Sequence, residues 1–352
     1  MIDLRSDTVT MPTKEMLDAI THAKLGDDVF QEDPTVNSLE EKAANIMGKD
    51  AGLLVPSGTM GNLVSILTHC DRGTEILLGD KSHTFYYEAG GISAFGGIHS
   101  RQLKNQSDGK IKLSDIQSSI RVDNVHFPRT SAITLENTHN LCNGFPLDPQ
   151  YVKDVVNIAH SNTIKVHVDG ARIFNAAVSL GINVNKLVEE VDSVTFCLSK
   201  GLSAPIGSII CGTENFIHEA RRTRKALGGG MRQAGIIAAA GIVSLEKMSE
   251  QIQKDHDHAQ ILAKEIMDIQ GLSIEKDKIK SNILYFDIEK DVNRSKELFD
   301  QTKGKNQYPF DIKLENICFL ETSPSRFRLV THHGILMEDI EKTLSVLKKM
   351  VV

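Results

Sequence analysis

The sequence lacks a cysteine pattern that could support a disulfide framework or a structural zinc ion. Its five cysteines are odd in number and scattered along 352 residues, and no two form a Cys-x-x-Cys pair. It also lacks an excess of one charge, because 40 basic residues face 46 acidic ones and the net charge is −6. This balance leaves no electrostatic footprint for nucleic acid or for an acidic membrane surface, so we expect neither as a partner.

Long apolar runs are absent as well. The longest weakly polar stretch, Gly235–Leu245, is too short to span a bilayer. The opening Met1–Arg5 has neither the basic nor the apolar region of a signal peptide. With 40% hydrophobic and 24% charged residues, the composition is that of an ordinary globular protein with room for two or three domains. We therefore expect a soluble, cytoplasmic protein.

Helical patterns alternate with short apolar runs, which indicates an α/β protein with a mostly parallel sheet. Two helices are predicted where an aspartate N-cap precedes a proline, at Asp33-Pro34 and at Asp148-Pro149, and Gly48 would end the first. Several strand candidates are continuous apolar runs, as expected for strands covered on both faces. The candidates are Gly52–Pro56, Glu75–Leu78, Ile98–Leu103, Ala132–Glu136, Ile164–Val168, Ser193–Leu198 and Ser208–Cys211.

The C-terminal part has a different pattern. A long amphipathic helix is predicted around residues 236–270, followed by isolated strands at Ile283–Asp287 and Arg326–Val330. The polar stretch Glu289–Gln307 is predicted to be a surface excursion, and a closing helix carries apolar residues from Met337 onward on one face. We predict a catalytic domain of residues 1–245 and a small α+β domain of residues 246–352.

One candidate binding motif is the string from Pro56 to Asn62, between an apolar strand and a helix. Free backbone N–H groups, the positive end of the helix dipole and the hydroxyls of Ser57 and Thr59 meet there, as in a phosphate cradle. A simple strand-to-helix turn with Ser57 as N-cap is the alternative. The string has neither the Gly-Lys-Ser/Thr ending of a Walker loop nor the Gly-x-Gly-x-x-Gly of a dinucleotide fold.

Three further candidates follow predicted strands. Asp169 could face a pyridine nitrogen and keep it protonated, or could cap the next turn. Lys200 ends a buried strand, where desolvation favours its neutral, nucleophilic amine; a surface lysine is the alternative. His83 could stack on a planar cofactor, transfer protons, or simply hydrogen-bond in a loop.

These features follow one another along the chain as a phosphate cradle, a stacking ring, an acid for a pyridine nitrogen and an imine-forming lysine. Pyridoxal phosphate is the common cofactor that uses all four. We therefore predict a pyridoxal-phosphate enzyme whose cofactor is carried as a Schiff base on Lys200.

Long strings spread over the chain closely resemble the threonine aldolases, within the fold-type-I pyridoxal-phosphate enzymes. They cover residues 1 to about 245 densely and return at Arg328–His332. The resemblance implies a transferase-like large domain with a mostly parallel seven-stranded sheet and a small α+β C-terminal domain. The strings are Asp3–Thr10, Gly26–Val29, Glu32–Thr35, Pro56–Asn62, Glu136–Asn140, Val168–Asn175, Cys197–Gly201 and Gly228–Gly235.

The resemblance also implies roles for individual residues, with the substrate carboxylate held by a bidentate arginine. The implied cofactor-binding residues are Ser57, Gly58, Thr59, His83, Asp169, Arg172, Lys200 and Arg232, the last from a neighbouring subunit. The implied substrate-binding residues are Ser6, Tyr87, Arg172 and Arg328. The implied catalytic residues are Lys200, His83, His126 and Asp169. No metal site is predicted.

The implied reaction is a reversible retro-aldol cleavage of L-threonine or L-allo-threonine to glycine and acetaldehyde, in a homotetramer with active sites shared between subunits. The base for the β-hydroxyl proton stays open between His83, His126 and a water held between them. β-Elimination or transamination on the same scaffold is the nearest alternative. A nicotinamide oxidoreductase would need a glycine fingerprint that is missing, and a non-catalytic binding protein would not need the lysine and the aspartate.

Overall fold

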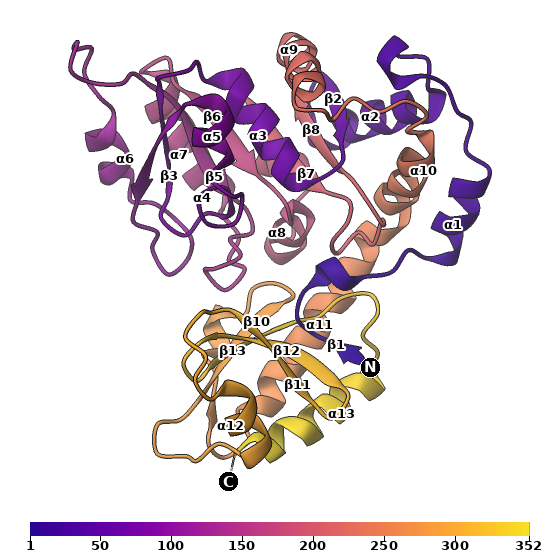
Figure 1. Cartoon of the computed structure of the whole chain (residues 1–352), viewed down its shortest axis with the longest axis vertical. Helices are drawn as coiled ribbons and strands as arrows, with labels where there is room; N and C mark the ends of the chain where they lie inside the picture. Colours follow the sequence, from indigo (N-terminus) through magenta and orange to yellow (C-terminus); the bar gives the residue numbers. More distant parts are fainter. Residues whose placement is uncertain (352) are drawn as a thin grey trace.

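The computed structural model describes residues 1–351, and its larger sheet has seven strands in the order β2-β8-β7-β6-β5-β3-β4 (Figure 1). Neighbouring strands are parallel except around β8, which is antiparallel to both β2 and β7. This confirms the mostly parallel seven-stranded sheet, with every strand within two residues of its predicted bounds. The strands are β2 (Ala51–Val55), β3 (Glu75–Gly79), β4 (His99–Leu103), β5 (Thr130–Glu136), β6 (Lys165–Asp169), β7 (Ser193–Cys197) and β8 (Ser208–Gly212).

Helices cover both faces of this sheet, which is why β3, β7 and β8 are buried along their whole length. On one face α3 (Gly58–His69) and α9 (Glu214–Ala226) pack against apolar side chains of β2 and β8. On the other face α2 (Pro34–Met47) and α7 (Pro149–His160) contribute to the main apolar core. The remaining helices of this part are α1 (Lys14–Thr21), α4 (His83–Tyr86), α5 (Gly91–Gly96), α6 (Leu113–Ser119) and α8 (Ile173–Leu180).

The predicted caps are present. Asp33 accepts hydrogen bonds from the N–H groups of Thr35 and Val36 at 3.1 and 3.0 Å, with Pro34 at the first turn of α2. Gly48 ends α2 with φ at +64°, a conformation that glycine adopts without strain. Asp148 caps α7 in the same way by accepting from the N–H of Tyr151 at 2.9 Å.

The smaller sheet has six strands, in the order β1-β12-β13-β10-β9, with β11 also paired to β12. The two strands predicted here pair with each other as antiparallel neighbours, so they are not isolated. The polar stretch predicted as a surface excursion contains a helix, α12 (Lys296–Thr302), because Ser295 caps it and Leu298 is buried in the core of this part. The strands are β1 (Ile2–Asp3), β9 (Leu272–Ser273), β10 (Ile283–Ile288), β11 (Phe310–Leu314), β12 (Ile317–Ser323) and β13 (Arg326–Val330).

One long helix joins the two parts of the molecule. It consists of α10 (Gly235–Val243), a π-helical turn (Ser244–Met248) and α11 (Ser249–Ile266), close to the predicted residues 236–270. Its first half packs in the core of the larger sheet and its second half in that of the smaller sheet, where the closing helix α13 (Met337–Leu347) also lies. Within residues 1–351, every helix is too short or too polar to cross a lipid bilayer.

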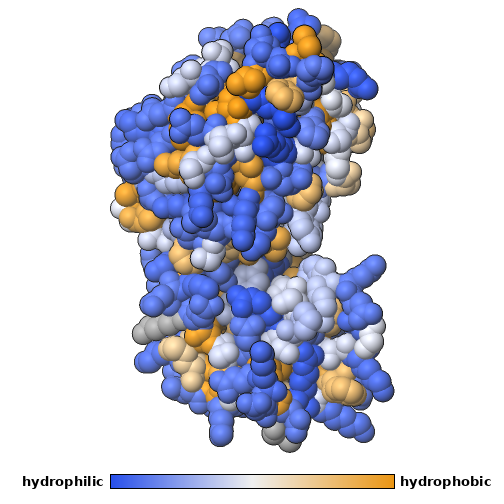
Figure 2. Space-filling model, turned by 90° about the vertical axis from the view of Figure 1, so that its left-hand side faces the viewer, coloured by the Kyte–Doolittle hydropathy of each residue, from blue (hydrophilic) through white to orange (hydrophobic). Residues whose placement is uncertain are grey.

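The two parts form separate lobes with a narrowing between them (Figure 2). Strand β1 pairs in parallel with β12, so the first residues of the chain lie on the smaller sheet. The chain then crosses to the larger sheet. The predicted division at residue 245 stays a prediction. The N-terminal segment contacts both lobes, so a single boundary in the sequence does not separate them.

Candidate active site

A cavity of about 180 Å³ opens at the carboxyl ends of β6 and β7, the edge where α/β folds place their ligands. It brings together the predicted cradle, the predicted stacking histidine, the predicted acid and the predicted lysine, which come from four separate stretches of chain. Its lining residues are Ser57, Gly58, Thr59, Asn62, His83, Glu88, Asp169, Ala171, Cys197, Ser199 and Lys200.

The first wall of the cavity is the N-terminus of α3. Ser57 caps this helix by accepting a hydrogen bond from the Met60 N–H at 3.2 Å. The N–H groups of Gly58 and Thr59 have no partner within the helix, and the helix dipole adds positive potential there. A Cβ on Gly58 would lie 2.8 Å from Cys197 Sγ, so only glycine fits this first helical position without a shift. The arrangement suits a phosphate group.

Asp169 is the last residue of β6, and its side chain is almost fully buried. Its Oδ2 accepts a hydrogen bond from Asn62 Nδ2 at 2.9 Å, and its Oδ1 accepts one from the Ala171 N–H at 3.1 Å. Both oxygens thus face N–H donors, the environment of an ionised carboxylate. The carboxylate is held at the cavity wall, where the sequence predicted an acid for a pyridine nitrogen.

His83 begins α4, where its own N–H donates to Glu136 Oε2 at 2.7 Å. Its ring Nδ1 lies 2.8 Å from Glu88 Oε1, and the ring of Tyr87 lies 5.5 Å away. Burial alone would lower the pKa of His83, but the hydrogen bond to Glu88 and the charges of Asp169 and Glu88 raise it. Burial also raises the pKa of Glu88. The pair therefore retains a proton to higher pH than a free histidine.

Lys200 follows β7 and is half-buried in the cavity wall. Its carbonyl accepts a hydrogen bond from Thr10 Oγ1 at 3.0 Å, so the N-terminal segment contacts the backbone of this lysine. The predicted position at the end of a buried strand is confirmed. The amine lies in the same cavity as Asp169 and the start of α3.

Arg172 lies just beyond β6 and is paired with Asp7 in a two-pronged contact. Arg172 Nε and Nη2 each lie 2.7 Å from a different oxygen of Asp7, and both side chains are buried. Burial alone would raise the pKa of Asp7, but the charge and hydrogen bonds of Arg172 hold it at about 2. Two of the three guanidinium nitrogens of Arg172 are therefore already used by the protein itself.

Arg328, on β13 of the smaller sheet, is buried without such a partner. Its Nη1 donates to Asn140 Oδ1 at 3.1 Å and its Nη2 to the carbonyl of Arg5 at 2.9 Å, next to Ser6. Its Nε has no hydrogen-bond partner, and no carboxylate among residues 1–351 lies within ion-pair distance of it. A buried guanidinium with a free N–H group is suited to bind an anion such as a substrate carboxylate.

Two predicted site residues lie away from the cavity in the single chain. His126 is exposed in the loop before β5, at the end of that strand opposite the site and roughly 20 Å along it. Arg232 is exposed and pairs with Asp27 at 3.0 Å. Neither role is supported by the isolated chain, and both stay predictions that require a neighbouring subunit.

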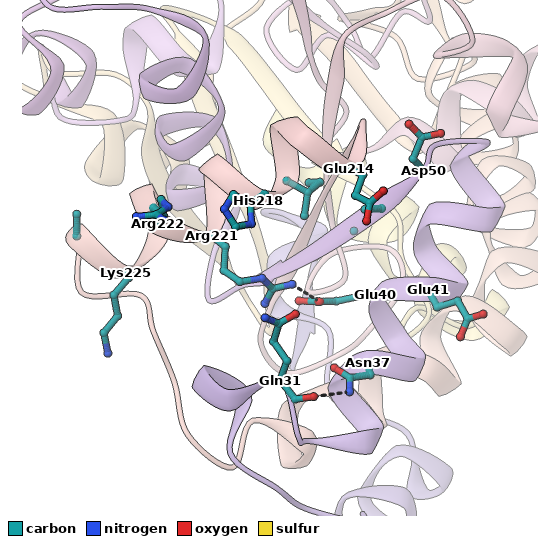
Figure 3. Close-up of a pocket in the computed structure, with 14 residues that line it drawn as sticks. Gln31, Asn37, Glu40, Glu41, Asp50, Glu214, His218, Arg221, Arg222 and Lys225 are labelled. Atoms are coloured by element: carbon teal, nitrogen blue, oxygen red, sulfur yellow. Dashed lines mark hydrogen bonds and ion pairs between the residues drawn. The ribbon is translucent and has the colours of Figure 1, made fainter.

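A larger hollow of about 850 Å³ lies beside α2 and α9 (Figure 3). Its most enclosed arginine, Arg221, contacts Glu40 at 2.7 Å, and acidic side chains such as Glu41 and Glu214 stand around it. None of the predicted site residues lines it. The smaller cavity is therefore the candidate active site, because it alone of the two combines an amine, a carboxylate and a cradle of N–H groups.

From the sequence, no individual role was predicted for Asp7, Asn62, Glu88 or Asn140. Asn62 follows Thr59 by three positions in a helix, which places both on one helix face, and that spacing was an available signal. The pairing of Asp7 with Arg172 spans 165 positions, and no local pattern indicates it.

The residues of the cavity fit pyridoxal phosphate. The N–H groups at the start of α3 suit its phosphate, Asp169 suits its ring nitrogen, and Lys200 supplies the amine for its aldehyde. The ring of His83 borders the same space. The fold and the cavity together define a fold-type-I pyridoxal-phosphate enzyme.

Comparison with known proteins specifies the class further. Residues 3–289 match the family described as beta-eliminating lyase. Low-specificity L-threonine aldolase 1 of Arabidopsis thaliana is 43% identical over 347 residues, 98% of this chain and 94% of that protein. A low specificity L-threonine aldolase of Escherichia coli (strain K12) is 45% identical over 266 residues, 76% of this chain and 79% of that protein. The chain therefore belongs to the threonine aldolases of the beta-eliminating lyase family, and it is a lyase.

The solved structures agree at the level of the fold. The Leishmania major threonine aldolase superposes with a TM-score of 0.79 and covers 99% of both chains, at 16% identity. These structures confirm the fold class expected from the sequence. The family match and the threonine aldolase relatives confirm the expected cofactor.

Proposed function

We propose that the chain cleaves L-threonine and L-allo-threonine to glycine and acetaldehyde by a reversible retro-aldol reaction, with pyridoxal phosphate carried on Lys200. The observation that carries the proposal is the convergence of Lys200, Asp169 and the start of α3 on one cavity. The relatives at 43% and 45% identity are low-specificity L-threonine aldolases, which supports the substrate class.

Bound pyridoxal phosphate would supply an electron sink for the pair left on the substrate Cα. Asp169, held by two N–H donors, keeps a proton on the group that accepts those electrons. Arg328 binds the substrate carboxylate through its free Nε–H, beside Ser6. By fixing the carboxylate, Arg328 would set the orientation of the bonds at Cα and so select the Cα–Cβ bond for cleavage when the cofactor is bound.

The base for the β-hydroxyl proton remains one of three groups. The raised pKa of His83 favours its protonated form, and a protonated imidazole cannot accept a proton, which weakens His83 as the base. His126 could act only from a neighbouring subunit, because the single chain places it at the other edge of the sheet. A water bound near His83 is the third option. A His126→Phe variant with an unchanged cleavage rate would remove His126 from this group.

The test of the reaction is a product assay on the purified protein. We expect glycine and acetaldehyde from L-threonine, whereas keto acid and ammonia would indicate the alternative, a β-eliminating lyase on the same scaffold. The variant Lys200→Ala should lose the visible absorbance of the bound cofactor and all turnover, because no other amine lines the cavity. A coloured and active Lys200→Ala variant would contradict the assignment.

We further propose a cytoplasmic homotetramer in which neighbouring subunits contribute to each active site. The side chain of Arg232, next to the loop Gly228–Gly230, is exposed and would have to leave Asp27 to reach a second subunit. Large apolar side chains such as Phe30 and Phe95 are exposed, and apolar patches are visible on the upper lobe in Figure 2. All five cysteines are free and buried, as is usual in a reducing compartment.

Light scattering tests the assembly, and mixing tests the sharing of sites. If Arg232 acts across an interface, then inactive Lys200→Ala and impaired Arg232→Ala subunits refolded together should regain activity. An active monomer, or mixed subunits with no more activity than the two variants measured separately, would contradict the shared site.

A further inference from the structure

We propose that Asn62 is a positioning residue that holds Asp169 and Glu88 through a single amide group, and that a chain of hydrogen bonds through His167 and Ser193 to His69 supports it from behind. The proposal rests on the proposed role of the cavity as a pyridoxal-phosphate site. It assigns Asn62 a role in setting the charge on the cofactor ring, through Asp169.

The amide nitrogen of Asn62 meets two carboxylates. Nδ2 lies 2.9 Å from Asp169 Oδ2 and 2.8 Å from Glu88 Oε1, and the side chain is buried. An amide nitrogen carries two hydrogens, so each carboxylate takes one. The opposite orientation would aim the amide oxygen at two acceptors, which is repulsive. Asn62 therefore has one favourable orientation.

The other end of the amide is compatible with this orientation. Asn62 Oδ1 lies 3.2 Å from His167 Nε2, and an amide oxygen only accepts, so this ring nitrogen carries the hydrogen. Complete burial lowers the pKa of His167 to about 3, so the ring is neutral and its Nδ1 is an acceptor. The Ser193 hydroxyl, 2.8 Å from Nδ1, must then donate to it.

The chain of hydrogen bonds extends one residue further. Ser193 Oγ lies 2.7 Å from His69 Nε2, and its only hydrogen is already given to His167, so it accepts from His69. Burial lowers the pKa of His69 to about 4, and its ring is stacked on Phe216 at a centroid distance of 4.4 Å. His69 also lines a different cavity, of about 430 Å³. Every donor in this chain thus points toward the active site.

These hydrogen bonds determine how the Asp169 carboxylate is held. With Oδ1 held by the Ala171 N–H and Oδ2 by Asn62, the carboxylate is fixed in rotation and surrounded by donors. The ligand atoms of His83, Glu88 and Asp169 all lie within 4.8 Å of one another. Without the shared amide, two carboxylates would face each other at this distance with no donor between them, and their repulsion would turn Asp169 out of its position. A displaced Asp169 could not keep the ring nitrogen of the cofactor charged.

The test uses the holoenzyme with two forms of the cofactor. Asn62→Asp keeps the shape of the side chain and removes its N–H groups. We expect kcat with pyridoxal phosphate to fall about 10- to 100-fold, the loss of one hydrogen bond to a charged group, with KM little changed. With N1-methylated pyridoxal phosphate, whose ring nitrogen is permanently charged, the same variant should be within about threefold of the unmodified enzyme.

A second readout does not depend on turnover. The apoprotein of Asn62→Asp should bind pyridoxal phosphate about tenfold more weakly, measured by absorbance titration, while its affinity for the methylated form changes little. The matched control is Asn105→Asp, another buried asparagine that does not line the cavity and whose amide donates to the Gly109 carbonyl and accepts from the Lys81 N–H. It should leave the ratio of the two affinities unchanged.

If Asn62→Asp does not fold, His167→Phe replaces it, because this variant removes the donor that orients Asn62 and leaves Asn62 in place. An equal defect with both cofactor forms, in kcat and in affinity, would reduce Asn62 to a structural residue and overturn the proposal. Failure of the proposed function is separate: the unmodified enzyme would then neither bind pyridoxal phosphate nor release glycine, whatever residue stands at position 62.

Discussion

The larger sheet supplies Arg172 to the site region and the smaller sheet supplies Arg328, and these two buried arginines differ in how their charge is balanced. Arg172 is matched inside the chain by Asp7, with two contacts of 2.7 Å. Arg328 donates to a carbonyl and an amide oxygen, lies beside the Tyr285 hydroxyl, has no carboxylate partner and keeps a free Nε–H. Removing one partner of a buried ion pair leaves an uncompensated charge, whereas an arginine without a carboxylate partner is available to a ligand.

The comparison predicts first that loss of Arg172 destabilises the protein strongly. Arg172→Met should lower the free energy of unfolding of the apoprotein by about 3–5 kcal/mol, because it leaves the Asp7 carboxylate buried without its partner. Urea unfolding followed by circular dichroism measures this. Arg328→Met, measured in parallel, should cost clearly less, since no carboxylate is left behind. Equal losses would remove the distinction between the two arginines.

The second prediction is that loss of Arg328 has a large effect on catalysis. Arg328→Ala should lower kcat/KM for threonine about 100- to 1,000-fold, because a bidentate, charge-assisted contact to the substrate carboxylate is lost. Steady-state kinetics with the cofactor saturating measures the effect. Arg328→Lys, which keeps the charge and loses the fork, should recover only part of it. Activity of Arg328→Ala within a few-fold of the unmodified enzyme would place carboxylate binding elsewhere.

The third prediction, with the smallest expected effect, concerns the stability of the folded protein at acidic pH. The pKa of Asp7 is about 2 in the folded protein, below its ordinary value of 3.8. A carboxyl group whose pKa is lowered on folding stabilises the folded protein at pH values above its ordinary pKa. This contribution of about 2 kcal/mol is lost as the pH falls from 3.8 through about 2. Unfolding of the apoprotein against pH measures it. The variant Asp7→Asn should be less stable at neutral pH and should lack this part of the acid dependence.

The two lobes also differ in how well the sequence predicts them. The strands of the larger sheet were predicted to within two residues because they are covered on both faces and therefore form continuous apolar runs. In the smaller sheet only β10 and β13 were predicted. Strand β1 has only two residues, too few to give a pattern. Strand β11 alternates apolar with polar residues, which is a strand signal, but the run of five residues is short and was not recognised.

The candidate site, too, could be predicted only in part from the sequence. Ser57, Asp169 and Lys200 each follow a strand that the sequence reveals, so their meeting at one sheet edge follows from the parallel topology. The bonds among Asn62, Glu88 and His83 depend on side-chain directions inside the folded protein, and spacing along the chain does not indicate them.

The central claim is that this chain carries pyridoxal phosphate on Lys200, at the carboxyl edge of the larger sheet. Reduction of the holoenzyme with borohydride, followed by digestion and peptide mass spectrometry, tests it most directly, because reduction fixes the cofactor to the amine that holds it. The account predicts one labelled peptide, with the added mass on Lys200. A label on another lysine, or a protein that takes up no cofactor, would contradict it.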